Sequence, residues 1–203
     1  SFKKASQLPV NFTVTATNTI SSSDSDNPIY AWYDNGNLYY YTNADKVYLN
    51  SNSSWMFNRL RNLTDVSGLA DVITSNTKTI DRMFQSCIEL EDITSLANWD
   101  TSNVTDIRYM FGSGDEEQIM KLSDITPLTN WDVSKGENMA DLFKNCIYLS
   151  DITPLANWNT SNVTDMHELF CTTVKTQINS NLKDIMPLKN WNTSKVTRMD
   201  RID

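Results

Sequence analysis

The sequence predicts an α/β fold in which short parallel strands and short helices form a solenoid, preceded by a β-hairpin cap at the N-terminus. Two observations support this. An apolar residue is followed twelve positions later by Phe or, once, by Asp, and this gap recurs five times. A run of Leu, Ile or Val, and Leu at intervals of three precedes each gap. Such fixed-period similarity is typical of stacked supersecondary units. The gaps join Val72 to Phe84, Trp99 to Phe111, Trp131 to Phe143, Trp158 to Phe170 and Trp191 to Asp203, and the runs open at Leu63, Leu90, Leu122, Leu149 and Leu182.

The N-terminal segment carries strand and hairpin signals. Apolar and polar residues alternate between Val10 and Ala16, a period that predicts a strand. The β-rich runs 29–33 and 38–42 flank Asn35-Gly36, which is the strongest short hairpin signal. A third apolar run covers 46–49. We expect residues 1–50 to be a β-rich N-terminal cap on the first unit, and residues 51–203 to hold about five units, the last one truncated.

Within each unit, the pattern predicts one helix and one strand. Val104, Ile107 and Phe111 fall at helical spacing, and residues 100–103 offer N-cap side chains, so we expect a helix of about two turns here. The segments that begin LEDIT, LSDIT and LKDIM are strand candidates. Stacked in successive units, they would form a parallel ladder along one face.

Composition excludes some classes of function. The chain of 203 residues has a net charge of −8, and its Lys and Arg residues are scattered singly. Nucleic acid is therefore not an expected partner, since phosphate contacts need clustered basic side chains. No apolar run is long enough to span a bilayer. Because the chain begins at Ser1 and ends inside a repeat, we expect it to be an excised piece of a longer protein, in which absent targeting signals carry no information.

The cysteines do not suggest a disulfide framework. Cys87, Cys146 and Cys171 are an odd, sparse set, and the first two share one repeat position two units apart. One strand spacing per unit would place their Cα atoms roughly 10 Å apart, whereas a disulfide tolerates about 7 Å at most. We expect buried free thiols.

The remaining residues with chemical potential also favour structural roles. The repeat tryptophans could stack on sugars, but Val72 occupies the same position in the first unit, which favours a buried column. The repeated acids could bind cations or a basic partner, but we expect each to accept hydrogen bonds from backbone N–H groups in its turn. His167 is the only histidine and is expected to be exposed. No cofactor and no metal site is predicted. The repeated acids are Asp65, Asp92, Asp124, Asp151 and Asp184.

The motifs themselves resemble a known family. The run F-x-x-C-x-x-L at 84–90, followed by WDTSNVTD and MF, resembles BspA-like leucine-rich-repeat surface proteins of bacteria. SDITPLTNW and SDITPLANW are similar to segments of internalin-type repeats. The resemblance covers roughly residues 20–203. It implies a right-handed leucine-rich-repeat-like solenoid, an extracellular place on the bacterial cell surface, and binding of macromolecules without catalysis.

These considerations predict a non-enzymatic adhesion module, monomeric, that recognises a protein or glycan on host or neighbouring cells. Two alternatives remain: a carbohydrate-binding module that uses the Tyr/Trp-rich hairpin, and a structural spacer that projects another domain. An enzyme ranks last. Long units alternate with short ones, and the insertions 112–121 and 171–181 lie on one edge. The candidate partner-binding residues are Glu91, Thr94, Ser123, Thr126, Tyr148, Thr153 and Lys183 on the strand face, and Tyr39 and Tyr41 in the hairpin.

Overall fold

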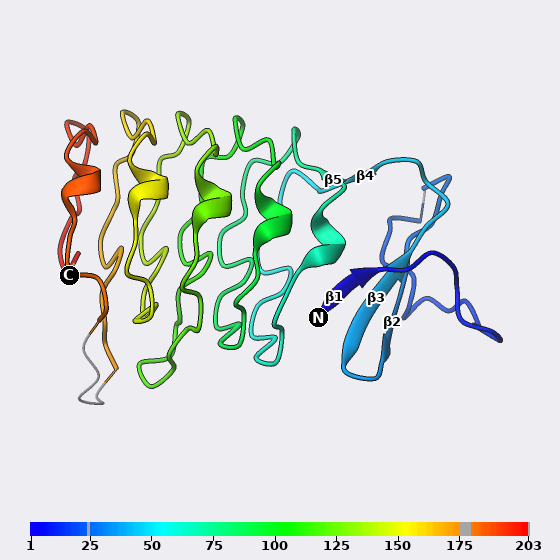
Figure 1. Ribbon diagram of the computed structural model, residues 1–203. Coiled ribbons are helices and arrows are strands. Elements are labelled where there is room, and N and C mark those ends of the chain that lie inside the picture. The colour runs from blue at the N-terminus through cyan, green and yellow to red at the C-terminus, as the bar shows by residue number, and fades with distance from the viewer. Residues whose placement is uncertain (24, 175–179, 203) are drawn as a thin grey trace.

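The computed structural model describes residues 1–23, 25–174 and 180–202. Figure 1 shows a small sheet at the N-terminal end and a row of repeat units that lie side by side up to the C-terminus. The sheet has the order β1-β3-β2. β1 (Phe2–Lys4) pairs in parallel with β3 (Asn37–Tyr41), and β2 (Tyr30–Asp34) pairs antiparallel with β3.

The hairpin formed by β2 and β3 turns at the Asn-Gly pair. Asn35 and Gly36 both have positive φ angles, of 44° and 80°, as a tight two-residue turn between right-twisted strands requires. The strand expected between Val10 and Ala16 is absent. Val10 and Val14 are exposed, and Phe12 packs against the hairpin, with its ring centroid 5.6 Å from that of Trp32.

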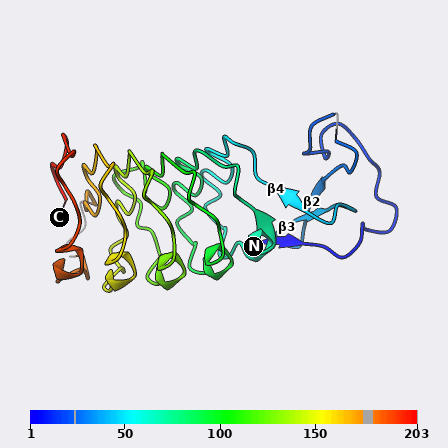
Figure 2. The same ribbon diagram turned by 90° about the horizontal axis from the view of Figure 1, so that it is seen from above.

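The first repeat unit joins the N-terminal region through a second small sheet, in which β4 (Val47–Tyr48) pairs in parallel with β5 (Val72–Ile73). Each unit then contributes one short 3₁₀ turn, and neighbouring turns contact one another along the row (Figure 2). The five turns are η1 (Ser67–Leu69), η2 (Thr94–Leu96), η3 (Thr126–Leu128), η4 (Thr153–Leu155) and η5 (Met186–Leu188).

The prediction of an α/β fold of the right-handed leucine-rich-repeat-like solenoid type is wrong. The described residues contain no α-helix, and their sheets have three and two strands only. Most of the described chain is irregular. Between the repeat units, parallel pairing is reduced to isolated single-residue bridges outside the named strands.

The predicted helices do not form, because one backbone position in each unit has a left-handed conformation. The residue two before each repeat Phe lies in the left-handed region, with φ of 55° at Arg82, 54° at Tyr109, 57° at Asp141 and 53° at Glu168. An α-helix cannot pass through such a residue without losing its hydrogen-bond pattern. The side chains of Val104, Ile107, Met110 and Phe111 are nevertheless all buried. The spacing therefore identified the buried positions but not the backbone conformation.

The parallel ladder between units also runs through other segments than the sequence predicts. The bridges run through the segments predicted as helices, at Thr79, Asp106, Asn138, Asp165 and Arg198. The predicted strand segments contribute only the bridge between Asp65 and Asp92, and their Ile residues immediately precede the 3₁₀ turns. Backbone hydrogen bonds connect each unit to the next along the new ladder, for example from the N–H of Phe84 to the carbonyl of Met110 at 3.0 Å.

Two columns of aromatic rings fill the inside of the row. Phe57, Phe84, Phe111, Phe143 and Phe170 stack successively, with ring centroids 5.4–5.9 Å apart. The indoles of Trp99 and Trp131 stack at 6.1 Å, and those of Trp158 and Trp191 at 6.3 Å. Each indole N–H donates to a Leu carbonyl of the preceding unit. Burial together with a satisfied polar group makes these side chains part of the core, as the sequence predicts for Trp99, Trp131 and Trp158.

Candidate functional site

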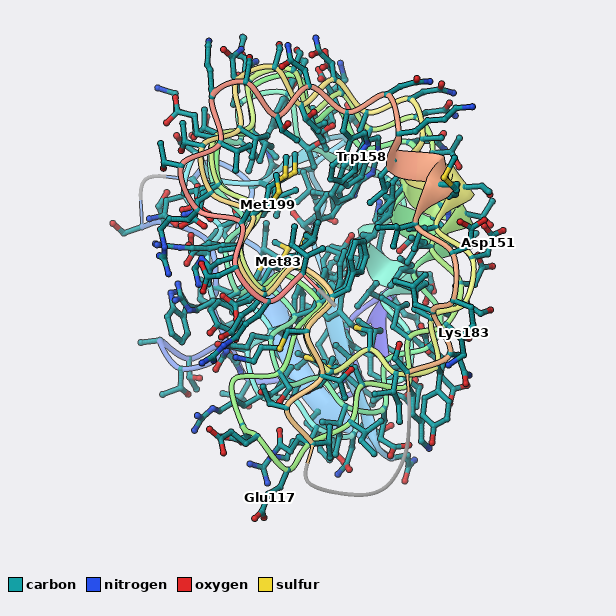
Figure 3. The ribbon with its side chains drawn as sticks, turned by 90° about the vertical axis from the view of Figure 1, so that its left-hand side faces the viewer. Met83, Glu117, Asp151, Trp158, Lys183 and Met199 are labelled. Carbon is teal, nitrogen blue, oxygen red and sulfur yellow. The ribbon has the colours of Figure 1, made fainter. Side chains whose placement is uncertain are left out.

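The best candidate for partner binding is the exposed surface where the 3₁₀ turns begin. Successive turns start at Thr94, Thr126 and Thr153, and all three side chains are exposed. In the view along the row, Asp151 and Lys183 lie on this side and Met199 on the opposite side (Figure 3). We call this surface the 3₁₀ face. It comprises Glu91, Asp92, Thr94, Ser123, Asp124, Thr126, Asp151, Thr153, Lys183 and Asp184.

An aspartate precedes each turn and fixes its shape. In every unit, its Oδ1 accepts a hydrogen bond from the backbone N–H two residues later. The five distances fall between 2.7 and 3.2 Å. This bond from the Thr153 N–H holds the pKa of Asp151 below its usual range. The predicted turn role of these acids is therefore confirmed, and it explains how like charges can recur along one face.

The charges of the 3₁₀ face are predominantly negative. Beside it, the Nζ of Lys121 lies 2.6 Å from Glu89 and 4.0 Å from Glu91. The hydrogen bond to Glu89 raises the pKa of Lys121, so this cation stays charged and neutralises part of the acidic edge. The turn-forming residues Asp92, Asp124, Asp151 and Asp184 are exposed. Such a surface offers carboxylate and hydroxyl groups at regular intervals on a fixed backbone.

The structure brings seven of the predicted residues together and separates the other two from them. Glu91, Thr94, Ser123, Thr126, Tyr148, Thr153 and Lys183 are all exposed along the row of units. Tyr39 and Tyr41 lie in β3, within the N-terminal sheet, and are only partly exposed. Tyr39 stacks on Trp32 at 5.6 Å, and the Tyr41 hydroxyl donates to Asn43. Tyr40 faces inward and donates to the Gly68 carbonyl at 2.8 Å.

The insertion at 112–121 packs back on the row. Arg61 lies 3.3 Å and Arg59 3.7 Å from the carboxylate of Asp115, so the insertion reaches back past the adjacent unit to the first one. Met120 is buried. The edge that the sequence predicts to be a variable or binding surface therefore packs in part against the repeat units. The central part of the other insertion, residues 175–179, lies outside the described residues.

A polar cluster that sequence reasoning missed lies where three units meet. Asp141 is fully buried, and its two oxygens lie 3.2 Å from Lys144 and 3.1 Å from His167 Nε2 without a well-aligned hydrogen bond. Burial raises the pKa of Asp141, against the opposing effect of Tyr109 and Lys144. Lys144 also donates to Glu168, and this bond lowers the pKa of Glu168.

The same cluster corrects the expectation that His167 is exposed. Its Nδ1 lies 2.6 Å from Asp165 and its side chain is mostly buried. The available signal was the set of charged or polar side chains at equivalent positions of neighbouring units: Arg82, Tyr109, Asp141, Glu168 and Arg201. Because Lys144 contacts Glu168 and His167 contacts Asp141, the cluster links neighbouring units. In the part of the chain that the structure describes, no group of three or more His, Cys, Asp and Glu residues could hold a metal ion.

Comparison with known proteins gives one family. Residues 51–181 and, overlapping them, residues 116–202 match the model of the family described as Mycoplasma protein of unknown function, DUF285. The chain belongs to DUF285. No curated protein and no solved structure matches it significantly. The repeat units of this DUF285 chain thus coincide with the matched region, which starts at the first unit.

The DUF285 match corrects the proposed resemblance. No leucine-rich-repeat or BspA family model matches the chain, so its assignment to BspA-like leucine-rich-repeat proteins is wrong. The recurring Trp, Phe and Asp positions that suggested it lie within the residues that match DUF285, apart from Asp203. None of the helices in the described ranges is both long and apolar enough to cross a bilayer.

Proposed function

We propose that this DUF285 chain is a non-enzymatic binding module on the outside of a bacterial cell, which attaches to a protein or glycan on a host or neighbouring cell. The observation that supports this is the row of equivalent exposed groups on the 3₁₀ face. Thr94, Thr126 and Thr153 repeat from unit to unit beside turn-forming aspartates. A ligand that spans several units would meet the same chemistry at each.

The physical basis is a rigid surface with many modest contacts. The aromatic columns and the unit-to-unit hydrogen bonds hold the backbone of the face, so binding requires little ordering of the protein. Its excess of carboxylates favours a partner that presents basic or hydrogen-bond-donating groups, and such complementarity accelerates association. The charged cluster around Asp141 is occupied by contacts between units and is not needed for this function.

The experiment is binding of the fluorescently labelled protein to cultured cells of a candidate host, measured by flow cytometry over a range of protein concentrations. The test variant is Thr94→Arg, Thr126→Arg and Thr153→Arg combined, which adds three cations at exposed positions of the 3₁₀ face. We expect saturable binding for the native chain and at least a tenfold weaker apparent affinity for the variant.

The matched control is Glu137→Arg, an exposed position just before the bridge at Asn138. This residue lies on the ladder segment and outside the 3₁₀ face. Its variant changes the net charge by two and should bind as the native chain does. Equal losses in both variants would show a general charge effect, and absence of saturable binding to any cell type would favour a spacer.

A second candidate function is carbohydrate binding at the hairpin. It is favoured by the stacked Trp32–Tyr39 pair, which is partly exposed, and by Tyr33, whose side chain is largely exposed. Aromatic faces of this kind can stack on the apolar side of a sugar ring. Glycan-array binding that disappears with Tyr39→Ala or Tyr41→Ala, and survives the threonine variant, would identify this function instead.

A further inference from the structure

A cavity lies at the junction of the N-terminal cap and the first repeat unit. It has a volume of about 340 Å³, within the range of small-molecule sites. Its floor includes the buried side chains of Phe2, Tyr40, Leu49 and Leu69. In Figure 1 the two parts meet at β4 and β5, and Val47 and Val72 from this pair also line the cavity. None of the residues that line it belongs to the 3₁₀ face or to the charged cluster around Asp141.

The repeat pattern explains why no side chain fills the cavity between the cap and the first unit. In each later unit, a Trp reaches back to the preceding layer, as when the Trp99 indole donates to the Leu69 carbonyl. The equivalent residue of the first unit is Val72, whose preceding layer is the cap. A valine leaves empty the volume that an indole would occupy. The cavity is therefore built by a substitution within the repeat pattern, at the one junction where a unit meets the cap.

The mouth of the cavity is lined by large apolar side chains that water contacts. Ile20 is 53% exposed, Tyr48 52% and Met56 44%, and all three line the same cavity. Each comes from a different segment of the chain. Exposed apolar groups that gather around a hollow, rather than being scattered, are typical of a surface that an apolar ligand covers.

The same mouth carries a positive charge. Lys46 lines the cavity, is exposed, and has no ion pair or hydrogen bond in the described part of the chain. Ser22 and Asn50 add polar groups around it. In a chain of net charge −8, an unneutralised ammonium beside an apolar hollow favours a negatively charged group at that place.

We propose that this cavity binds an amphipathic anion: an acyl chain lies against Ile20, Tyr48 and Met56 and enters the hollow, and its carboxylate or phosphate pairs with Lys46. A fatty acid and the acyl chain of an anionic lipid share this chemistry. The cap and the first unit together form the site, so ligand binding would couple these two parts of the molecule.

The test uses the whole chain and decanoate, titrated by isothermal titration calorimetry below the concentration at which decanoate forms micelles. We expect saturable binding of one decanoate per chain. Met56→Glu and Lys46→Glu change exposed residues, should leave the fold intact, and should each weaken binding at least tenfold. Val72→Trp restores the residue of the later units and should abolish binding by filling the hollow.

The matched control is Val10→Glu, which replaces an 87% exposed apolar residue outside the cavity and should bind as the native chain does. Decyltrimethylammonium, with the same tail and a positive head, should bind at least tenfold more weakly than decanoate. The proposal is overturned if decanoate does not saturate, if Met56→Glu binds normally, or if both head groups bind equally well.

A second arm distinguishes the two sources of the acyl chain. The protein is sedimented with phosphatidylglycerol vesicles, with Met56→Glu and Val10→Glu in parallel. Co-sedimentation that Met56→Glu abolishes and Val10→Glu retains identifies a membrane lipid as the ligand. Decanoate binding without co-sedimentation identifies a free fatty acid.

Discussion

At the scale of single residues, the indole N–H groups show how the core is specified. Each repeat Trp packs its ring in a column and donates its N–H to a Leu carbonyl one unit back, at 3.0 Å for Trp131 and 3.1 Å for Trp158. A ring that only filled space could be replaced by other apolar groups. The hydrogen bond adds a directional requirement, which fixes the distance between neighbouring units.

Replacing Trp131 with Ala should lower the free energy of unfolding by about 3–5 kcal/mol, because it opens a cavity and removes the indole hydrogen bond to the Leu96 carbonyl, which keeps only its bond from the Trp99 N–H. Urea denaturation followed by circular dichroism measures this change. Tyr148→Ala, at an exposed position, is the control and should alter stability by less than about 0.5 kcal/mol. A loss for Trp131→Ala no larger than for Tyr148→Ala would contradict the buried column.

The thiols provide a second residue-scale prediction. Burial raises the pKa of Cys87 to about 12, despite an opposing backbone hydrogen bond, and it also raises the pKa of Cys146. Because the folded state disfavours the thiolate, stability should fall as the pH rises above the ordinary thiol value near 9, where the unfolded chain ionises.

All three cysteines are buried and outside any disulfide, as the sequence predicts. At pH 8 we therefore expect a thiol reagent such as DTNB to react slowly with the native chain and fully after unfolding in urea. The same absorbance assay on the native protein decides the matter: rapid release of the chromophore by the folded chain would show an accessible, activated thiol.

At the scale of elements, the ladder segments show what the sequence could and could not predict. The spacing of Val104, Ile107 and Phe111 correctly marked buried positions, but a period of three to four suits both a helix and a tight coil whose turns return every third residue. The deciding feature is the left-handed residue at Tyr109, and no glycine or asparagine signals it there. A non-Gly residue in this conformation is imposed by packing between units, which no single unit reveals.

The sequence predicted the exposed positions of the candidate site but not the charged cluster. Exposed positions such as Thr94 and Thr126 follow directly from the repeat register, because the residues around them are apolar at fixed intervals. The cluster around Asp141 could not be derived in this way. Its charges come from different units and meet only after stacking, and the residue types change from unit to unit.

The charged cluster makes a pH prediction at this scale. The hydrogen bond from Lys144 lowers the pKa of Glu168, so Glu168 stabilises the fold above its ordinary value of 4.5, and this contribution is lost as the pH falls through the lowered value. Burial gives Asp141 the opposite sign, since its pKa is raised and protonation relieves the buried charge.

Glu168→Gln should therefore destabilise the chain by about 1–2 kcal/mol at pH 7, and its difference from the native chain should shrink as the pH falls below 4.5. Urea denaturation at several pH values measures this. Glu137→Gln, at an exposed position outside the charged cluster, serves as the control. A Glu168→Gln difference that stays constant from pH 7 to pH 3.5 would refute the assigned role.

At the scale of the whole molecule, the repeat units share one continuous core, and each presents equivalent groups on its outer surface. The Phe column runs from Phe57 to Phe170 through five rings, and the 3₁₀ turns follow one another along a single side. The interior determines the distance between units, and therefore the distance between equivalent groups on the outside. A long ligand can add contacts unit by unit without any deep pocket on that face.

The junction between cap and row is the place where this regularity is interrupted. There Val72 stands at the Trp position, and a cavity opens beside it. The two proposed sites thus follow from one repeat pattern. The 3₁₀ face lies where successive units are equivalent, and the acyl site lies where Val72 replaces the Trp of the later units. They can be tested separately, because no residue lining the cavity belongs to the 3₁₀ face.

The most direct measurement of the central claim is the ratio of two dissociation constants on the same host cells. One belongs to the chain with arginine at positions 94, 126 and 153, and the other to Glu137→Arg. A ratio of ten or more is expected, since only the first variant disrupts the array of equivalent groups. A ratio near one, with saturable binding in both, would contradict recognition through the 3₁₀ face.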